Sequence, residues 1–348
     1  MRRVWIAVAV AVALGASAIV ATLVTTHTAG GPHILVYSES AGRNPMNDVV
    51  WRANVDGTHR VRLTKGSDPT ISPDGRLVAL VRDACASRSK GSTCRYRKLF
   101  VATASSGKIE RVIDEKANSY APTWALDSRH LALQPEFKHT IFVLDVKTGA
   151  KTLIASGRFV GFASFSPDSR FVVYLRSERS SSRPNLTSDL YVADLASGRS
   201  RRITHLGDAF APVWGPQDIA FTHNQEVWLV DQKGNHLRRL VGREGALLSW
   251  WPALWSDGGR KLLLSAIYVG GGESFKVIDV PGDRVSFSGR GYLLGLSHDG
   301  KVALVDDCAN YFGTKLGRVE TVPLNGDKAR VVVPTPKNGI CPSASWTG

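Results

Sequence analysis

The chain has 348 residues, with 44 Lys and Arg against 30 Asp and Glu, and its formal net charge is +14 at pH 7. It contains 33 Gly and 16 Pro, and a long apolar run of the helical kind occurs only at the N-terminus, which excludes a helical bundle. The cations are scattered over predicted edge strands rather than gathered in one patch, which argues against a nucleic-acid-binding protein.

The N-terminal segment, residues 1–30, carries an export signal. Arg2 and Arg3 precede an uncharged, mostly apolar run from Val4 to Val24, long enough to form a helix across a bilayer with the chain outside the cytoplasm. Ala16-Ser17-Ala18 also fits a cleavage site after a shorter apolar core. A retained signal-anchor helix and a cleaved signal peptide are therefore the two alternatives. The first predicts a membrane-attached protein and the second a secreted one.

A turn followed by an apolar strand recurs along the rest of the chain. The matching stretches are PTISPDGRLVALV, PTWALDSRHLALQ, ASFSPDSRFVVYL, PVWGPQDIAFT, ALWSDGGRKLLLS and LGLSHDGKVALV. Each is followed by a strand, a Gly-containing turn and another strand, as in DLYVADLASGRSRRI. Each unit therefore predicts four short strands joined by tight turns, and units about 45 residues apart indicate a β-propeller.

The two ends of the repeat region complement each other. Residues 33–64 contain the second, third and fourth strand patterns without a first, whereas Pro342–Gly348 resemble a first strand with nothing after it. Trp346 falls in the repeat position of Trp124, Trp214 and Trp255. We therefore predict that the C-terminal strand completes the N-terminal sheet in an all-β propeller of seven four-stranded blades, with six blades as the alternative.

The repeat pattern resembles that of the TolB-like and WD-repeat-like β-propellers of bacteria. ISPDGRLVALV, FSPDSRFVVYL and DLYVADLASGRSRRIT carry the resemblance, which covers residues 33–348. It implies the propeller fold. Six blades are usual in the TolB-like family, and no α/β domain of the TolB kind precedes residue 33. The outer-membrane lipoprotein partner of TolB is therefore not carried over to this chain.

Four cysteines predict two disulfides in an exported protein. Cys85 and Cys94 lie in one insertion between predicted strands, Cys308 lies in the matching loop of the last complete blade, and Cys341 lies in the connector before the closing strand. The propeller topology pairs Cys85 with Cys94 and Cys308 with Cys341. Free or metal-bound thiols are the alternative, without support from any CxxC spacing or Cys/His cluster.

Catalytic motifs are scarce. Ser297, His298 and Asp299 are adjacent in a predicted turn, and adjacent residues cannot build a Ser–His–Asp triad. No HExxH, Walker A, GxGxxG or EF-hand pattern is present, so the sequence predicts no catalytic residue, metal or other cofactor.

Aromatic residues recur just before the first strand of successive blades. The corresponding positions hold Asp68, Tyr120, Phe159, Phe210, Trp250 with Trp251, Tyr292 and Ile340. In a closed propeller these positions ring the axis on one face, where exposed aromatics would bind a partner. The alternative is packing between blades. The long polar loop RSERSSSRPNLTSDL, with a glycosylation sequon at Asn185, is expected on the same face.

Two function classes follow. The first is an extracytoplasmic, non-catalytic binding module in the cell envelope, expected as a monomer, whose partner is a protein, peptide or glycan. The second is a hydrolase or lyase of the propeller type, with its active site in the central channel. We interpret the scattered positive charge as protection of the edge strands from pairing with other chains. The alternative is that it attracts anionic lipid headgroups or an acidic wall polymer.

Overall fold

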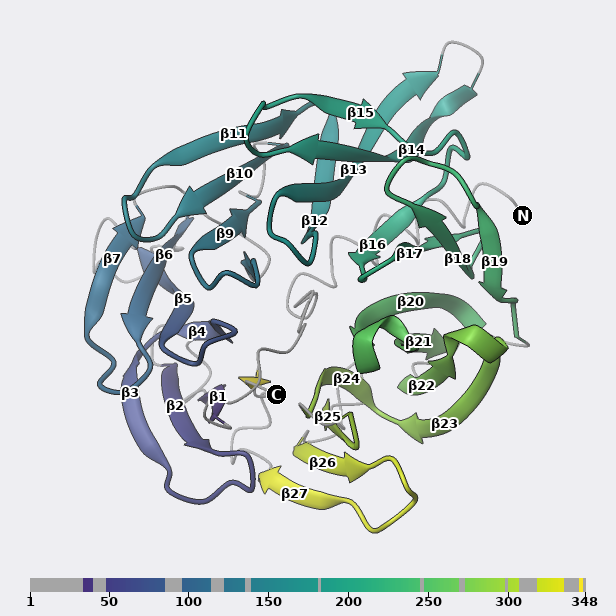
Figure 1. Ribbon diagram of the computed structural model, residues 1–348. Coiled ribbons are helices and arrows are strands. Elements are labelled where there is room, and N and C mark those ends of the chain that lie inside the picture. The colour runs from purple at the N-terminus through teal and green to yellow at the C-terminus, as the bar shows by residue number, and fades with distance from the viewer. Residues whose placement is uncertain are drawn as a thin grey trace.

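The computed structural model describes residues 34–39, 48–84, 96–113, 122–134, 139–180, 183–244, 247–268, 273–297, 300–306, 318–334 and 344–346. These residues form seven antiparallel four-stranded sheets, arranged as blades around a central axis (Figure 1). The short alternating apolar runs form strands because one face of each sheet packs on the next blade. The predicted seven-bladed arrangement is therefore observed, and the six-bladed alternative is wrong.

Blades 1 to 4 are numbered from the first strand of the chain. Blade 1 contains β28 (Ala344–Trp346), β1 (Ile34–Glu39), β2 (Val49–Asn54) and β3 (Val61–Lys65). Blade 2 contains β4 (Ser67–Ile71), β5 (Leu77–Ala84), β6 (Tyr96–Thr103) and β7 (Ile109–Ile113). Blade 3 contains β8 (Thr123–Trp124), β9 (His130–Leu133), β10 (Thr140–Asp145) and β11 (Lys151–Ser156). Blade 4 contains β12 (Phe159–Phe165), β13 (Phe171–Ser180), β14 (Arg183–Asp194) and β15 (Ser200–Arg202).

Blades 5 to 7 follow the same order, with the first strand innermost. Blade 5 contains β16 (Phe210–Trp214), β17 (Asp218–His223), β18 (Glu226–Asp231) and β19 (Arg238–Val241). Blade 6 contains β20 (Leu247–Ser256), β21 (Lys261–Tyr268), β22 (Glu273–Asp279) and β23 (Arg284–Arg290). Blade 7 contains β24 (Tyr292–Leu296), β25 (Val302–Asp306), β26 (Val319–Pro323) and β27 (Arg330–Val333). Two 3-10 turns, η2 (Asp257–Gly259) and η3 (Val280–Gly282), lie in blade 6.

The two ends of the repeat region meet in blade 1. Strand β28 pairs antiparallel with β1, with Leu35 opposite Trp346 and Tyr37 opposite Ala344. Strand β28 accordingly lies beside β1 near the centre of the ring (Figure 1). The hydroxyl of Ser345 also accepts a hydrogen bond from the backbone N–H of Ile71 in blade 2, 3.3 Å away. The predicted closure is therefore confirmed, and the closing strand also contacts the next blade.

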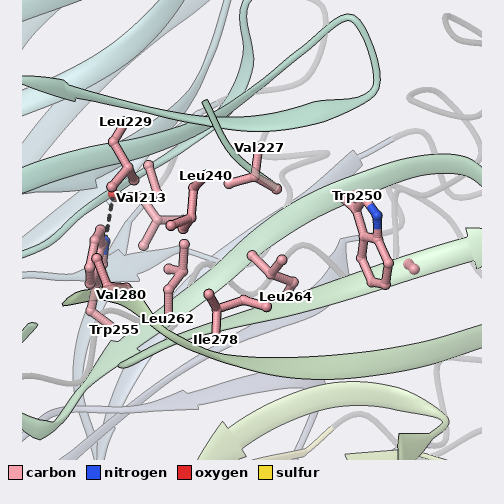
Figure 2. Close-up of a cluster of buried hydrophobic side chains, with 12 residues drawn as sticks. Val213, Val227, Leu229, Leu240, Trp250, Trp255, Leu262, Leu264, Ile278 and Val280 are labelled. Atoms are coloured by element: carbon pink, nitrogen blue, oxygen red, sulfur yellow. Dashed lines mark hydrogen bonds between the residues drawn. The ribbon is translucent and has the colours of Figure 1, made fainter. Parts of the chain in front are cut away.

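The recurring tryptophan of the first strand joins blade 3 to blade 2 and blade 6 to blade 5. Trp124 donates its indole N–H to the carbonyl of Thr70 in blade 2, and Trp255 donates to the carbonyl of Val213 in blade 5, both at 3.1 Å. Figure 2 shows this bond above Val280 and Leu262, within the core between blades 5 and 6. The tryptophans therefore combine apolar packing with satisfaction of a backbone carbonyl.

The SPDG-like stretches close the turn between the first and second strands. The hydroxyl of Ser72 donates to the carboxylate of Asp74 and accepts the backbone N–H of Leu77. Ser166 makes the same bonds with Asp168 and Phe171. In these two turns the Ser and Asp of the repeated sequence thus form the same side-chain network, which stabilises the turn.

The outermost strands β3, β7, β11, β15, β19, β23 and β27 are strongly basic. Their only carboxylate is that of Glu110, and they contain eleven Lys or Arg residues: Arg62, Lys65, Arg111, Lys151, Arg201, Arg202, Arg238, Arg239, Arg284, Arg290 and Arg330. We name these seven strands the outer rim. Such charges on an exposed edge oppose pairing with other chains.

Part of the outer rim also joins neighbouring blades. Arg111 in blade 2 donates to the carbonyls of Val146 and Lys147 in the β10–β11 turn, and Arg201 in blade 4 donates to carbonyls in the β18–β19 turn. The turns themselves dock closely on the preceding blade. A Cβ on Gly57 would overlap the carbonyl of Val332, and φ is +81° there, so the position requires glycine.

The predicted N-terminal helix requires a correction. Within the described ranges there is no α-helix, and no helix is long and apolar enough to cross a membrane. The run from Val4 to Val24 lies outside the described residues, and the described residues form an all-β propeller. Cys85, Cys94, Cys308 and Cys341 also lie outside the described residues, and their predicted pairing stays a prediction.

We expect removal of residues 344–348 to lower the melting temperature by on the order of 5 °C or more, because β1 then loses one of its two partner strands and exposes an apolar sheet edge. Thermal unfolding followed by circular dichroism measures this. Removal of residues 347–348 alone, which leaves β28 intact, is the control. Equal melting temperatures for both truncations would contradict the role of β28 in closing the ring.

The turn between β14 and β15 predicts a pH dependence. Backbone N–H groups of Ser197 and Ala196 donate to the carboxylate of Asp194 and lower its pKa below the usual 3.8, against a smaller opposing effect of burial. A lowered folded-state pKa stabilises the protein above pH 3.8, and this contribution is lost as the pH falls further. We therefore expect Asp194→Asn to unfold more easily than the wild type at neutral pH, with the difference in melting temperature disappearing in acid. A difference that stays constant with pH would contradict this.

Candidate functional site

Antiparallel strand order divides the loops between two faces. One face carries the connectors that lead into each first strand and the loops between second and third strands, including residues 157–158, 203–209, 223–226 and 242–244. We call it the connector face. The other face, the turn face, carries the SPDG-like turns and the turns between third and fourth strands. The predicted site residues belong to the connector face.

Five ring side chains form a continuous chain of contacts on the connector face. The centroids of His139 and Phe159 lie 6.4 Å apart, those of Phe159 and Phe162 6.5 Å, those of Phe162 and Phe210 4.4 Å, and those of Phe210 and Trp251 6.2 Å. We call these five residues the aromatic arc. The four residues after His139 are half-buried, and His139 is exposed. The arc spans blades 3, 4, 5 and 6, so the fold assembles it from distant parts of the chain.

Phe162 occupies the centre of the arc and was not predicted from the sequence. It lies in a bulge of β12 between Gly161 and Ser164, with φ at +55°, in the left-handed region that bulky residues rarely adopt. Its backbone N–H donates to Oε1 of Gln134 in blade 3, 2.9 Å away. The bulge directs the ring edge-on against Phe210. The same left-handed bulge occurs at Asp68 and Ala211 in the first strands of blades 2 and 5, so Phe162 is a functional candidate because of the ring that it places in the arc.

Trp250 has to be removed from the predicted binding surface. It is fully buried in the core between blades 5 and 6, where Figure 2 shows it beside Leu264. The hydroxyl of Thr222 in blade 5 donates to its carbonyl at 2.6 Å, and the ammonium of Lys276 lies 4.8 Å from its ring centroid. Trp250 therefore packs between blades, which was the alternative to a place on the binding surface, whereas its neighbour Trp251 belongs to the arc.

The other predicted positions fall outside the arc. Tyr292 is half-buried and packs against the core cluster between blades 7 and 1. Asp68 has φ at +49° and accepts a hydrogen bond from the hydroxyl of Ser67. Tyr120 and Ile340 lie outside the described residues. The structure thus brings Phe159, Phe210 and Trp251 together from the predicted set.

A buried carboxylate shapes the connector that leads to Phe210. Asp189 accepts hydrogen bonds from the Thr204 hydroxyl at 2.9 Å and from the backbone N–H of Leu206 at 2.7 Å, and it pairs with the guanidinium of Arg202. It is 3% exposed, so these bonds are needed to offset its desolvation. Asp189 therefore fixes the loop from which Asp208 and Phe210 emerge.

Asp208 forms a polar cluster beside the arc. Its carboxylate pairs with Nδ1 of His223 and accepts the backbone N–H of Asn224 at 3.1 Å. Nε2 of His223 lies 3.2 Å from Nδ2 of Asn224, and the ring packs edge-on against Trp228 at 5.4 Å. Both ring nitrogens are thus engaged within the protein, so the cluster holds the β17–β18 turn in place.

The predicted long polar loop is a β-hairpin. Strands β13 and β14 pair from Phe171 opposite Asp194 to Ser180 opposite Arg183. Figure 1 shows them extending beyond the other strands of blade 4. The sequon residue Asn185 lies in β14, and Thr187 donates its hydroxyl to the carbonyl of Glu178.

The described part of the connector face provides apolar ring surface with a few hydrogen-bonding groups. Within that part no cluster of three or more His, Cys, Asp or Glu could hold a metal ion. Such a surface can bind a ligand by ring packing, with Asp208 and Asn224 positioned at its edge.

No protein-family model matches this chain, and no curated protein matches its sequence. Among solved structures, the β-propeller domain of the Trilobed protease from Pyrococcus furiosus is similar, with a TM-score of 0.63 and 16% identity over 88% of this chain and 96% of that one. That domain is described as having an open velcro topology, whereas β28 closes the ring here.

Two other similar structures differ in function. Oligogalacturonate lyase in complex with manganese gives a TM-score of 0.58 and 13% identity over 87% of this chain and 85% of that one. TolB from Acinetobacter baumannii gives 0.52 and 15% over 90% of this chain, which spans 66% of TolB. The TolB match agrees with a bacterial β-propeller. At these identities the likeness shows the fold alone.

The neighbouring tryptophans Trp250 and Trp251 provide a direct test of the site assignment. Trp250→Ala opens a cavity between blades 5 and 6, and we expect it to cost about 3–5 kcal/mol of stability. Trp251→Ala removes one ring contact of the arc, with an expected loss of about 0.5–1.5 kcal/mol. Chemical denaturation of both variants measures the difference. Equal losses would show that Trp251 is also a core residue.

Proposed function

We propose that this protein is a non-catalytic recognition domain that binds its ligand on the connector face, over the aromatic arc. The observation that carries the proposal is the unbroken series of ring contacts from His139 to Trp251, supplied by four blades. Half-buried aromatic side chains held by a rigid scaffold are typical anchors of binding surfaces, because little conformational freedom is lost on binding.

The construction of the arc supports binding rather than core packing alone. Trp250 is fully buried, whereas Phe159, Phe162, Phe210 and Trp251 remain partly exposed, so part of their ring surface is accessible to a ligand. The backbone of Phe162 is held in a strained conformation by Gln134, which positions the ring beside Phe210 before any ligand arrives. Preorganisation of this kind increases affinity.

A lyase or hydrolase acting at the same face is the second candidate. Its support is the carboxylate–imidazole pair of Asp208 and His223 next to Phe210, together with the similarity in fold to a lyase and a protease domain. The engagement of both His223 nitrogens favours a structural role for this pair. Binding without turnover is therefore the first proposal. The proposed setting is extracytoplasmic, on the basis of the export-type N-terminal sequence.

Capture from the cell envelope tests the proposed function. The full-length protein is immobilised and incubated with envelope extract from its own host, and retained saccharides and peptides are identified by mass spectrometry. We expect Phe162→Ala with Trp251→Ala to retain at least about tenfold less of the specific component than the wild type, since each buried interface aromatic contributes over about 2 kcal/mol.

The matched control carries Leu153→Ala with Leu237→Ala. These two leucines are 53% and 43% exposed and lie away from the arc, so the control should retain as much as the wild type. Equal retention by the arc variant would contradict the proposed surface. Release of chemically cleaved material would replace the recognition proposal with the enzymatic one.

A further inference from the structure

The outer rim holds a larger excess of positive charge than the stability of the ring requires. Its seven strands contain a single carboxylate, that of Glu110, so they supply much of the net charge of +14. Several of its arginines are used structurally: Arg202 pairs with Asp189, Arg238 with Asp283 and Arg284 with Asp279. These pairs explain part of the basic composition and leave the remainder unexplained.

Four cations of the outer rim make no such contact. Arg62, Lys65, Arg290 and Arg330 are exposed, and none of their side chains forms a hydrogen bond or ion pair with another described residue. Arg330 acts on the carboxylate of Asp56 in blade 1 only through its charge. They lie on β3, β23 and β27, and Figure 1 shows blades 6, 7 and 1 to be consecutive around the ring. The four charges therefore occupy one continuous sector of the rim.

The positive charge continues around the ring beyond this sector. Arg111 in blade 2 and Arg201 in blade 4 donate only to carbonyl oxygens, which leave the charge of the guanidinium unneutralised. Exposed aliphatic side chains lie between the cations, with Val61 47%, Val285 46% and Val331 42% exposed. The rim is thus a cationic belt with apolar patches along the circumference of the propeller.

We propose that the outer rim is a second binding surface, separate from the connector face, which binds a flexible linear polyanion, with its main contacts over blades 6, 7 and 1. A charged belt on a convex circumference presents only a few blades to a flat lipid surface. A flexible chain can follow the belt and neutralise cations on successive blades. Repeated anionic groups on one chain also make the individually weak surface contacts additive.

Binding of two defined polymers to the full-length protein tests this proposal. Fluorescently labelled polygalacturonate represents a carboxylate polysaccharide and labelled polyphosphate represents a phosphate polymer, and affinity is measured by fluorescence anisotropy. We expect binding that weakens steeply between about 50 and 200 mM salt, because bound counterions are released on association. Binding of either polymer supports the proposal, and preference between them identifies the anionic group.

The decisive variant combines Arg62→Gln, Lys65→Gln, Arg290→Gln and Arg330→Gln. We expect its affinity to fall at least about tenfold, with a nearly unchanged melting temperature, because none of the four side chains forms a hydrogen bond or ion pair with another described residue. The control combines Arg76→Gln, Lys147→Gln, Arg199→Gln and Lys233→Gln, four exposed cations of the turn face. It loses the same formal charge and should lose less than about twofold in affinity.

Three outcomes would overturn the proposal. The first is absence of binding to both polymers at low salt, and the second is an equal loss of affinity in the rim and control variants. The third is binding to phosphatidylglycerol vesicles as tight as to the polymers, which would identify a lipid surface instead. Because the arc variant Phe162→Ala with Trp251→Ala keeps the rim intact, it should bind the polymers like the wild type, so the two surfaces are tested separately.

Discussion

The ring depends on the antiparallel pairing of β28 with β1. Without this pairing, the blades at the two ends of the ring would expose apolar surface and unpaired backbone groups. The residues of β1 that pair with the closing strand are also buried in the core. They are Leu35, Val36 and Tyr37. The hydroxyl of Ser345 then contacts the backbone of blade 2. Closure therefore defines the distance between blades all around the axis.

That distance is maintained by contacts of two kinds at the blade junctions. Near the axis, Trp124 and Trp255 fill the space between first strands and bond a carbonyl of the preceding blade. At the rim, Arg111 and Arg201 bond the turn of the following blade. The junction between blades 2 and 3 has both kinds of contact, that between blades 4 and 5 has the arginine contact and that between blades 5 and 6 has the tryptophan contact. Side chains from different blades therefore meet in a defined geometry. The contact between Phe162 and Phe210, which belong to blades 4 and 5, requires this rigidity.

The fold was predictable because its signals are local and repeated. Two of the SPDG-like turns share one side-chain network, and seven units in one chain reinforce a pattern that is weak in any single unit. The candidate site was only partly predictable. Trp250 and Trp251 are adjacent in sequence, and only the strand register shows which of them faces the core. Phe162 was missed because a bulge reverses the direction of its side chain, and its pattern FASF gives no sign of the bulge. The N-terminal helix, predicted from hydropathy alone, has no counterpart in the described residues.

The pairing of β28 with β1 also bears on the order of folding. Blades 2 to 7 consist of strands that are consecutive in sequence, so each can form soon after its residues leave the ribosome. Blade 1 joins strands from opposite ends of the chain, and the entropy of closing so long a loop is lost before the new contacts compensate for it. Ring closure is thus the expected slow step of folding. Until it occurs, β1 presents an unpaired edge of Leu35, Val36 and Tyr37, and aggregation competes with folding during this interval.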